Sequence, residues 1–326
     1  MKPIRRWSVY AFAAASGCSA ALIAGCGSTP KQPTPGPVVT RPTQAPSIDA
    51  VVKAQNQRVD GLSSLWARHT LRVSGKLANA KLDKEEAEGH FQLILPRKVA
   101  ITVTKVGETY FYLGSNDELY WWLDLTEAKR GYFGRHALAT TTTVDRFGIP
   151  VHPLDLIELM AITPIDEALL KKPGAVTTPK WSSDGQLLWY DVPARDATKR
   201  VLVDPKSLLP AFVELLDKNG KVIVRAELAN YLDIPSRSKP SARPRIPTRI
   251  TIDVPRSDLT ILINLYDPET RTPKAVAFDF AYLAKTAYPV NALDDLDQPL
   301  DQPVERPVER PVEKPVERPV GEKSVP

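Results

Sequence analysis

The residue types that most often bind metals or form covalent intermediates are few in this chain of 326 residues. The four histidines are His69, His90, His136 and His152. No two of them stand four residues apart, as the histidines of the zinc-binding HExxH motif do. Both cysteines, Cys18 and Cys26, lie near the amino terminus. The sequence therefore predicts no metal site and no cofactor.

A hydrolase is the second chemistry that these side chains suggest. His152 lies near Asp145 and Asp155 in the sequence, and these three could form an acid/base cluster. Three serines could then supply a nucleophile, namely Ser236, Ser238 and Ser257. No Gly-x-Ser-x-Gly elbow, phosphate-binding loop or paired-carboxylate motif accompanies them. We interpret His152 as the residue that begins a helix, and we predict that the chain is not an enzyme.

The amino-terminal segment has the pattern of an export signal. Lys2, Arg5 and Arg6 precede a mostly apolar run over residues 7–24, and small residues follow before Cys26. The run is too short and too quickly broken for a stable membrane-spanning helix. The four residues before the cysteine are Leu22, Ile23, Ala24 and Gly25, and together with Cys26 they resemble the bacterial lipobox.

This resemblance implies that residues 1–25 are cleaved and that Cys26 is acylated, by palmitate or a similar chain, as the lipid attachment site. Several acyl chains on one residue would give lasting membrane attachment. Cys18 would be lost with the signal, which leaves no partner for a disulfide bond. Gly27 follows the cysteine, whereas Asp at this position commonly marks inner-membrane retention in enterobacterial lipoproteins. The resemblance therefore favours the bacterial envelope, at the outer membrane and facing the periplasm.

Proline is concentrated in two flanking segments. Thirteen of the 31 prolines lie in residues 27–46 and 291–326. We predict a lipidated cysteine and extended tether over 26–46, one domain over 47–290, and a disordered tail over 291–326. The tail repeats Pro-Val-Glu-Arg or Pro-Val-Glu-Lys, which excludes helix and central strand and suits a spacer or a contact with the cell wall. The net charge of +5 forms no dense basic stripe, so we expect no nucleic-acid partner.

Hydrophobic periodicity predicts a mainly β domain with a few helices, an α+β fold. Apolar residues at helical spacing predict helices over 48–66 and 152–162. Alternating patterns predict strands at 71–77, 86–95, 98–106, 108–114, 118–124, 187–192, 199–204, 210–217, 221–230, 247–254, 259–266 and 274–282. Their short connections favour antiparallel pairing. We expect a single large curved antiparallel sheet that forms an unclosed β-barrel, with the two helices covering its concave face.

The interior of such a barrel is the candidate binding site. Apolar residues that are expected to point inward are Val73, Phe91, Leu93 and Val103, and the aromatic residues Tyr110, Tyr112 and Trp122 are further cavity candidates. Trp121 and Trp122 are adjacent on a strand and so must face opposite ways; we expect one in the core and the other exposed. An apolar interior of this size suits lipid chains, although any sheet needs an apolar core.

Three segments of the domain resemble the LolA and LolB family of lipoprotein carriers and receptors. They are Leu71-Arg-Val-Ser-Gly-Lys-Leu77, Glu88-Gly-His-Phe-Gln-Leu-Ile-Leu-Pro96 and Tyr110-Phe-Tyr-Leu-Gly-Ser-Asn-Asp-Glu-Leu-Tyr-Trp-Trp122. The segment Asp204-Pro-Lys-Ser-Leu-Leu-Pro210 is similar to a later strand-turn-strand return of that family. The resemblance implies a half-barrel under a helical lid that binds acyl chains of lipids or lipoproteins, in outer-membrane lipoprotein sorting. Two alternatives remain: an envelope lipoprotein that binds other proteins through its sheet and tail, and an anchored hydrolase.

Overall fold

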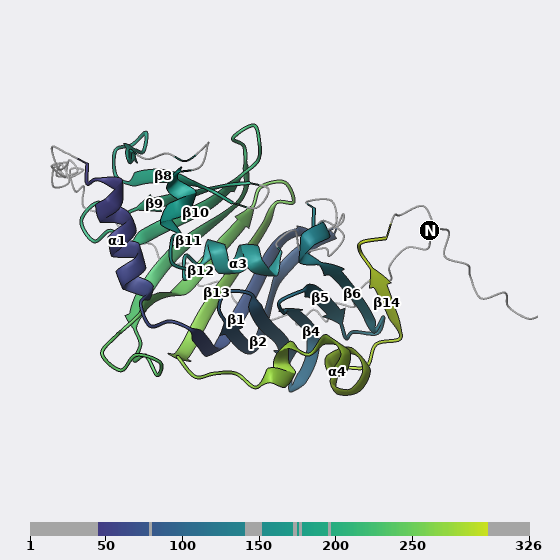
Figure 1. Ribbon diagram of the computed structural model, residues 1–326. Helices are drawn as coiled ribbons and strands as arrows, with labels where there is room; N and C mark the ends of the chain where they lie inside the picture. The colour runs from purple at the N-terminus through teal and green to yellow at the C-terminus, as the bar shows by residue number, and fades with distance from the viewer. Residues whose placement is uncertain are drawn as a thin grey trace, which may run out of the picture. The chain divides into compact units, whose positions relative to one another are not determined.

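The computed structural model describes residues 45–77, 80–140, 152–171, 175, 178–194 and 197–298. In this part of the chain, fourteen strands form a single sheet (Figure 1). The strands are β1 Ser64–Leu77, β2 Ala80–Ile94, β3 Lys98–Lys105, β4 Glu108–Ser115, β5 Leu119–Asp124, β6 Arg130–Arg135, β7 Lys180–Trp181, β8 Leu188–Pro193, β9 Thr198–Val203, β10 Pro210–Leu216, β11 Val222–Asp233, β12 Arg245–Val254, β13 Leu259–Glu269 and β14 Ala292–Asp295.

The sheet is open. Its order is β14-β6-β5-β4-β3-β2-β1-β13-β12-β11-β10-β9-β8-β7, and the two end strands, β14 and β7, do not pair with each other. Two antiparallel meanders, one on each side of the central β1–β13 pair, make up most of it. The predicted fold class is confirmed: the chain is mostly β, with one large unclosed curved sheet and few helices.

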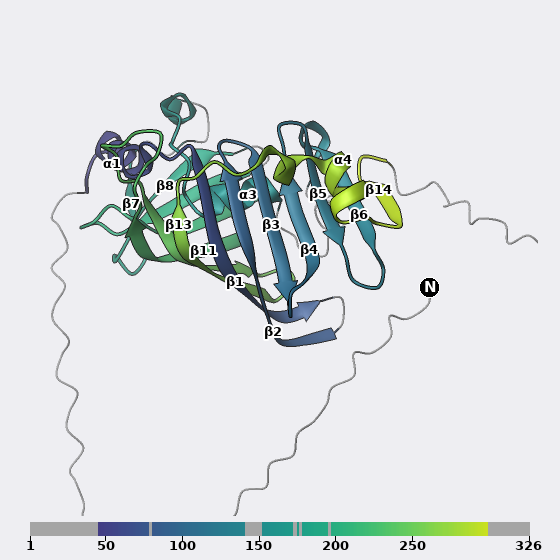
Figure 2. The same ribbon diagram turned by 90° about the horizontal axis from the view of Figure 1, so that it is seen from below.

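Two helices, α1 Ile48–Val59 and α3 Pro153–Leu159, cover one face of the sheet, which we call the inner face. α1 packs against β12, whereas α3 packs against both β4 and β10. Six strands separate β4 from β10 in the sheet order, so the sheet must curl around α3 to bring both within reach. In Figure 2, α3 is seen between β1 and β3 on the far side of the sheet. The two helices predicted to cover the sheet therefore do so.

The helix predicted over 48–66 ends earlier than expected. Ser47 caps its start, because the Ser47 hydroxyl accepts a hydrogen bond from the Ala50 amide. Its end is set by Gly61, whose φ of +79° breaks the helix, and β1 begins at Ser64. A Cβ atom at Gly61 would lie 2.8 Å from Cβ of Ala242, so this tight turn requires glycine.

The segment predicted as a strand over 274–282 is helical instead. It forms the 3₁₀ helix η3 Ala275–Phe278, the short helix α4 Phe280–Tyr282 and the π-helix η4 Leu283–Ala287. Asp279 begins α4 by accepting a hydrogen bond from the Tyr282 amide. Phe278, Leu283 and Ala284 from this segment pack on the outer face of β3–β5 and bury a second apolar cluster there. The alternation of residues 276–282 was misleading, because these contacts rather than a strand partner bury the segment.

The last strand lies in the predicted tail. Residues 292–295 form β14, which pairs with β6, and the pairing is parallel rather than antiparallel as expected. Arg130 of β6 donates two hydrogen bonds to the Asp294 carboxylate. The rest of the predicted tail, from residue 299 onward, lies outside the described residues.

The adjacent tryptophans Trp121 and Trp122 do face opposite sides, but both are buried. Trp121 is fully buried on the outer face beneath the α4 segment, and Trp122 is 8% exposed on the inner face. The prediction that one of these two tryptophans is exposed is therefore wrong, because β5 is covered on both faces.

Alternating charges cross the outer face from β8 to β12. Register partners in successive strands are Asp191, Arg200, Glu214, Arg225 and Asp253. Arg200 donates two hydrogen bonds to the Asp191 carboxylate, at 2.8 and 2.9 Å, and its guanidinium lies 4.0 Å from the ring centre of Trp189. Opposite charges on neighbouring strands stabilise this register of the sheet.

Candidate ligand-binding face

The inner face carries one continuous apolar cluster, to which α1, α3 and most of the strands contribute. Phe91 and Leu93, two of the predicted cavity residues, lie in the middle of it and are 2% and 0% exposed. Their side chains contribute to the packed core beneath the helices. An added ligand would reach them only after side chains above them had moved.

Beside this core, part of the inner face is apolar but incompletely covered. Val73 on β1 and Val103 on β3, also predicted cavity residues, are partly exposed and pack at the border of the cluster. Leu71 and Phe111 have the same character, and Phe111 is the direct cross-strand partner of Val103. We call these four residues, Leu71, Val73, Val103 and Phe111, the inner apolar strip. It is a part of the described inner face where an apolar ligand could make contact without unfolding the core.

The predicted aromatic candidates do not gather at one place. Trp122 lies on the inner face, with its ring centre 4.9 Å from that of Phe111, and so it borders the inner apolar strip. Tyr112 lies on the outer face, where its hydroxyl donates a 2.6 Å hydrogen bond to the Ala277 carbonyl and where burial raises its pKa. The prediction that Tyr112 lines the cavity is therefore wrong, because residues 111 and 112 must alternate. Tyr110 is partly exposed at a bulge where the β3–β4 register shifts.

A buried arginine joins the two covering helices. Arg58 of α1 donates hydrogen bonds to the carbonyl of Ala161, just after α3, and to that of Arg245 at the start of β12. Its guanidinium also reaches the Gln55 side chain, and burial lowers its pKa. Arg58 lies seven residues after Val51, a spacing that places both residues on the buried side of the helix.

His69 is a buried histidine on the inner face. Its imidazole passes over Gly89 of β2, and Nε2 lies 3.0 Å from the Thr102 carbonyl of β3. A Cβ atom at Gly89 would lie 2.9 Å from this nitrogen and 1.7 Å from the Thr102 carbonyl oxygen, so only glycine fits. Burial lowers the pKa of His69 to about 4, and the hydrogen bond to Thr102 opposes this shift only in part. The ring is therefore neutral at neutral pH and acts as a donor from Nε2.

Two further histidines lie together at the start of α3. His152 is fully buried, and its Nδ1 accepts a hydrogen bond from the Leu154 amide, which begins the helix as predicted. The rings of His136 and Tyr120 pack against it, with ring centres 5.3 and 4.5 Å away. The cluster positions the start of α3 near the start of β5.

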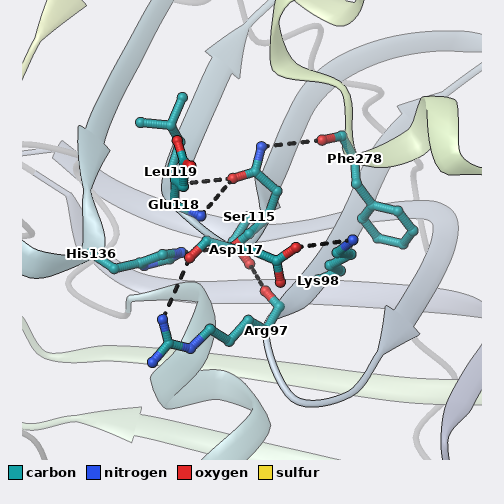
Figure 3. A network of polar contacts seen from close by, with 9 residues as sticks. Arg97, Lys98, Ser115, Asp117, Glu118, Leu119, His136 and Phe278 are labelled. Carbon is teal, nitrogen blue, oxygen red and sulfur yellow. Dashed lines mark hydrogen bonds and ion pairs between the residues drawn. The ribbon is translucent and has the colours of Figure 1, made fainter.

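The turn between β4 and β5 holds this end of the sheet together (Figure 3). Asn116 accepts hydrogen bonds from the amides of Glu118 and Leu119 and donates one to the Phe278 carbonyl. Its own carbonyl lies 2.9 Å from Nε2 of His136. Asp117 forms an ion pair with Lys98, and Ser115 donates to the Arg97 carbonyl. This turn thus links the β2–β3 turn, the end of β6 and the segment on the outer face.

The serines considered as nucleophiles form hydrogen bonds to backbone carbonyls. The hydroxyls of Ser236 and Ser238 contact the Gly61 carbonyl, and the Ser257 hydroxyl donates to the Val254 carbonyl. Asp145 lies outside the described residues. Among those residues, no group of three or more histidine, cysteine, aspartate or glutamate side chains could hold a metal ion. None of the described helices has the length and apolar character needed to span a membrane.

The predicted signal and lipid attachment site are not described by the structure. Leu22, Ile23, Ala24, Gly25 and Cys26 all precede residue 45, where the described part begins. Their assignment remains a prediction from the sequence.

Several solved structures have a similar arrangement of elements. An outer membrane lipoprotein-sorting protein domain from Vibrio parahaemolyticus is 12% identical, with a TM-score of 0.48; the match covers 73% of this chain and 97% of that one. A DUF1329 family protein from Desulfovibrio piger is 9% identical, with a TM-score of 0.48, and the match covers 73% and 99%. A LolA superfamily protein from Nitrosomonas europaea is 10% identical, with a TM-score of 0.42, and the match covers 73% and 100%.

The sequence itself matches no protein-family model. It also matches no curated protein. The function of this chain must therefore be argued from its own residues.

Proposed function

We propose that this protein is a binding protein for the acyl chains of lipids or lipoproteins, held at a membrane by acylated Cys26. The observation that carries the proposal is the inner apolar strip: apolar side chains that remain partly exposed on the concave face of an open sheet. Exposed apolar surface at a concave site commonly marks a place where an apolar ligand or partner binds.

The strip can supply part of the binding free energy of an acyl chain. Each buried methylene contributes about 0.8 kcal/mol, so a chain that places about six methylenes against the strip gains about 5 kcal/mol before the cost of association. Because association itself costs about 4 kcal/mol or more, contact with the strip alone gives weak and reversible binding, which suits a protein that receives or passes on its ligand. A longer contact would require the side chains above Phe91 and Leu93 to move, because those residues are closed off.

The flanking segments fit the same role. In this proposal the signal over residues 1–25 is removed, Cys26 carries the acyl chains, and residues 27–46 form the tether. At roughly 3 Å per residue an extended tether of this kind would reach at most about 60 Å from the membrane. The domain would then work close to the periplasmic side of an outer membrane, with the Pro-Val-Glu-Arg tail as a spacer. In outer-membrane lipoprotein sorting it would take acyl chains from one site and release them to another, without chemical reaction.

Native mass spectrometry with lipid extraction tests the proposal. Residues 27–326 are produced without the signal and Cys26, so that the protein's own anchor cannot be mistaken for a ligand. We expect copurified acyl chains, and we expect Val73→Asp to remove them because the charge enters the inner apolar strip. Leu202→Asp is the matched control, since Leu202 is a partly exposed strand residue on the outer face. A folded domain that stays empty and takes up no added lipid would contradict the proposal and favour a protein-interaction role.

A further inference from the structure

A polar groove lies on the outer face of the sheet, on the side away from α1 and α3. It has a volume of about 290 Å³ and lies over β13, β1, β2 and β3. Six of its lining residues are polar and alternate along their strands with buried residues of the inner face such as Ala67 and Phe91. They are Arg68, Thr70, Glu88, His90, Thr104 and Tyr266.

Strand register brings these six side chains onto one patch. Arg68 of β1 pairs with His90 of β2 on one side and with Tyr266 of β13 on the other. In the next row, Glu88 of β2 pairs with Thr70 of β1 and with Thr104 of β3. Because they stand on paired strands rather than on loops, their spacing is fixed before any ligand arrives.

The floor of the groove is held by hydrogen bonds that cross the strands. The Thr102 carbonyl contacts Nε2 of His69, and the Thr102 hydroxyl accepts a 3.0 Å hydrogen bond from the His90 amide. Gly89 brings β2 and β3 together at this point, where any side chain would clash. The floor is thus backbone and small residues, and the functional groups stand around it.

Several of these groups have unused hydrogen-bonding capacity. Within the described part of the chain, neither the Glu88 carboxylate nor the His90 ring has a hydrogen-bond or ion-pair partner. The His90 ring is positioned by Trp66, whose ring centre is 5.4 Å away. Tyr266 is 46% exposed, and its hydroxyl lies 3.4 Å from that of Thr70. The groove therefore presents acceptors, donors and one accessible aromatic face.

We propose that this groove binds a neutral saccharide, one or two pyranose rings of a glycan chain. A pyranose ring has an apolar C–H face, which can stack on Tyr266, and hydroxyl groups around its edge, which can both donate and accept. The Glu88 carboxylate, the His90 ring and the threonine hydroxyls are suited to pair with such hydroxyls. The volume lies near the lower end of the roughly 300–1,000 Å³ typical of small-molecule sites, which suits a small ring and not a large cofactor.

The charges of the groove disfavour ionic ligands. An anion such as phosphate would meet the Glu88 carboxylate, and the Arg68 guanidinium already forms an ion pair with Asp267. A cation would meet that guanidinium. The groove lies on the opposite face of the sheet from the inner apolar strip, so the two sites are separate.

Isothermal titration calorimetry on the full-length chain tests the proposal, in a detergent whose head group is not a sugar. The probes are two neutral β-1,4-linked tetrasaccharides, one of N-acetylglucosamine and one of glucose, with inorganic phosphate as the ionic comparison. We expect at least one tetrasaccharide to bind with a Kd of about 1 mM or tighter. We expect Tyr266→Ala and Glu88→Ala each to raise the Kd of that tetrasaccharide by about tenfold or more.

Matched controls separate the groove from the rest of the surface. Tyr282→Ala removes an equally exposed tyrosine, and Glu227→Ala removes an exposed outer-face carboxylate, both outside the groove. These variants, and Val73→Asp on the inner face, should bind the tetrasaccharide as the parent chain does. Three results would each overturn the proposal: no tetrasaccharide binding at about 10 mM, binding that survives both groove substitutions, or groove-dependent binding of phosphate alone.

Discussion

Lowering the pH should destabilise this protein through His69 in a defined pH range. Burial lowers the pKa of this histidine from 6.5 to about 4 in the folded state, whereas the unfolded chain keeps the ordinary value. Below pH 6.5 the unfolded state therefore binds a proton that the folded state does not, so stability falls as the pH falls toward 4 and this contribution is constant below it. Each pKa unit corresponds to about 1.4 kcal/mol, so the full contribution is about 3.5 kcal/mol, of which about 2.5 kcal/mol falls between pH 7 and 4.5.

Urea unfolding at pH 7 and pH 4.5 measures this effect when the parent protein is compared with His69→Gln. Glutamine keeps a side-chain nitrogen that can donate to Thr102 but cannot be protonated in this range, so the variant should lose about 2.5 kcal/mol less than the parent between the two pH values. His90→Gln is the matched control on the neighbouring strand. The parent and His69→Gln share all other titrating groups. The contribution of His69 is therefore the difference between their changes in unfolding free energy from pH 7 to pH 4.5. Equal losses for the parent and His69→Gln, within about 0.5 kcal/mol, would refute the assigned role of His69.

Three substitutions test the contacts that hold the sheet and its covers together. Tyr112→Phe removes the buried hydrogen bond to Ala277 and should lower the free energy of unfolding in urea by about 1 to 2 kcal/mol. Amide exchange in residues 275–287 should become faster, and unchanged exchange there would contradict the prediction. Asp191→Asn breaks the ion pair with Arg200, which contains two hydrogen bonds, and should lower the free energy of unfolding by about 2 kcal/mol. This loss should persist in 1 M salt, because the carboxylate is largely buried. A cost below about 0.5 kcal/mol would contradict the prediction. Arg58→Met removes the donor of two partly buried carbonyls and should cost about 2 kcal/mol in the same assay. Equal or greater stability would show that these bonds contribute nothing.

Much of the sheet could be predicted because its alternation is local. Leu259, Ile261, Ile263 and Leu265 are all buried on the inner face, as period-two spacing indicates. The inward positions of Phe91 and Leu93 follow in the same way. The degree of burial of these side chains could not be predicted, because it depends on where α3 packs.

The missed elements depend on contacts distant in sequence. β6 contains Gly131 and Gly134, which weaken a strand pattern, yet both lie against other side chains: added Cβ atoms would lie 2.6 Å from side-chain atoms of Leu293 and Tyr120. β14 spans only four residues, and its partner lies about 160 positions earlier. No local pattern carries that information.

The candidate site was only partly predictable for the same reason. Val73, Val103 and Trp122 share the inner face because strand register places them there. Tyr112 was assigned to the wrong face because the sequence showed neither the segment over 275–287 nor its carbonyl at Ala277. Arg58 was not among the predicted site residues, although its spacing from Val51 places it on the buried side of α1.

Photo-crosslinking with a fatty acid that carries a diazirine on its chain tests the central claim most directly. The purified domain is loaded, irradiated and digested, and the modified residues are identified by mass spectrometry. Our account predicts crosslinks within β1, β3 and β4 at the inner apolar strip, which disappear in Val73→Asp and persist in Leu202→Asp. Crosslinks spread over the outer face, or unchanged by Val73→Asp, would contradict it.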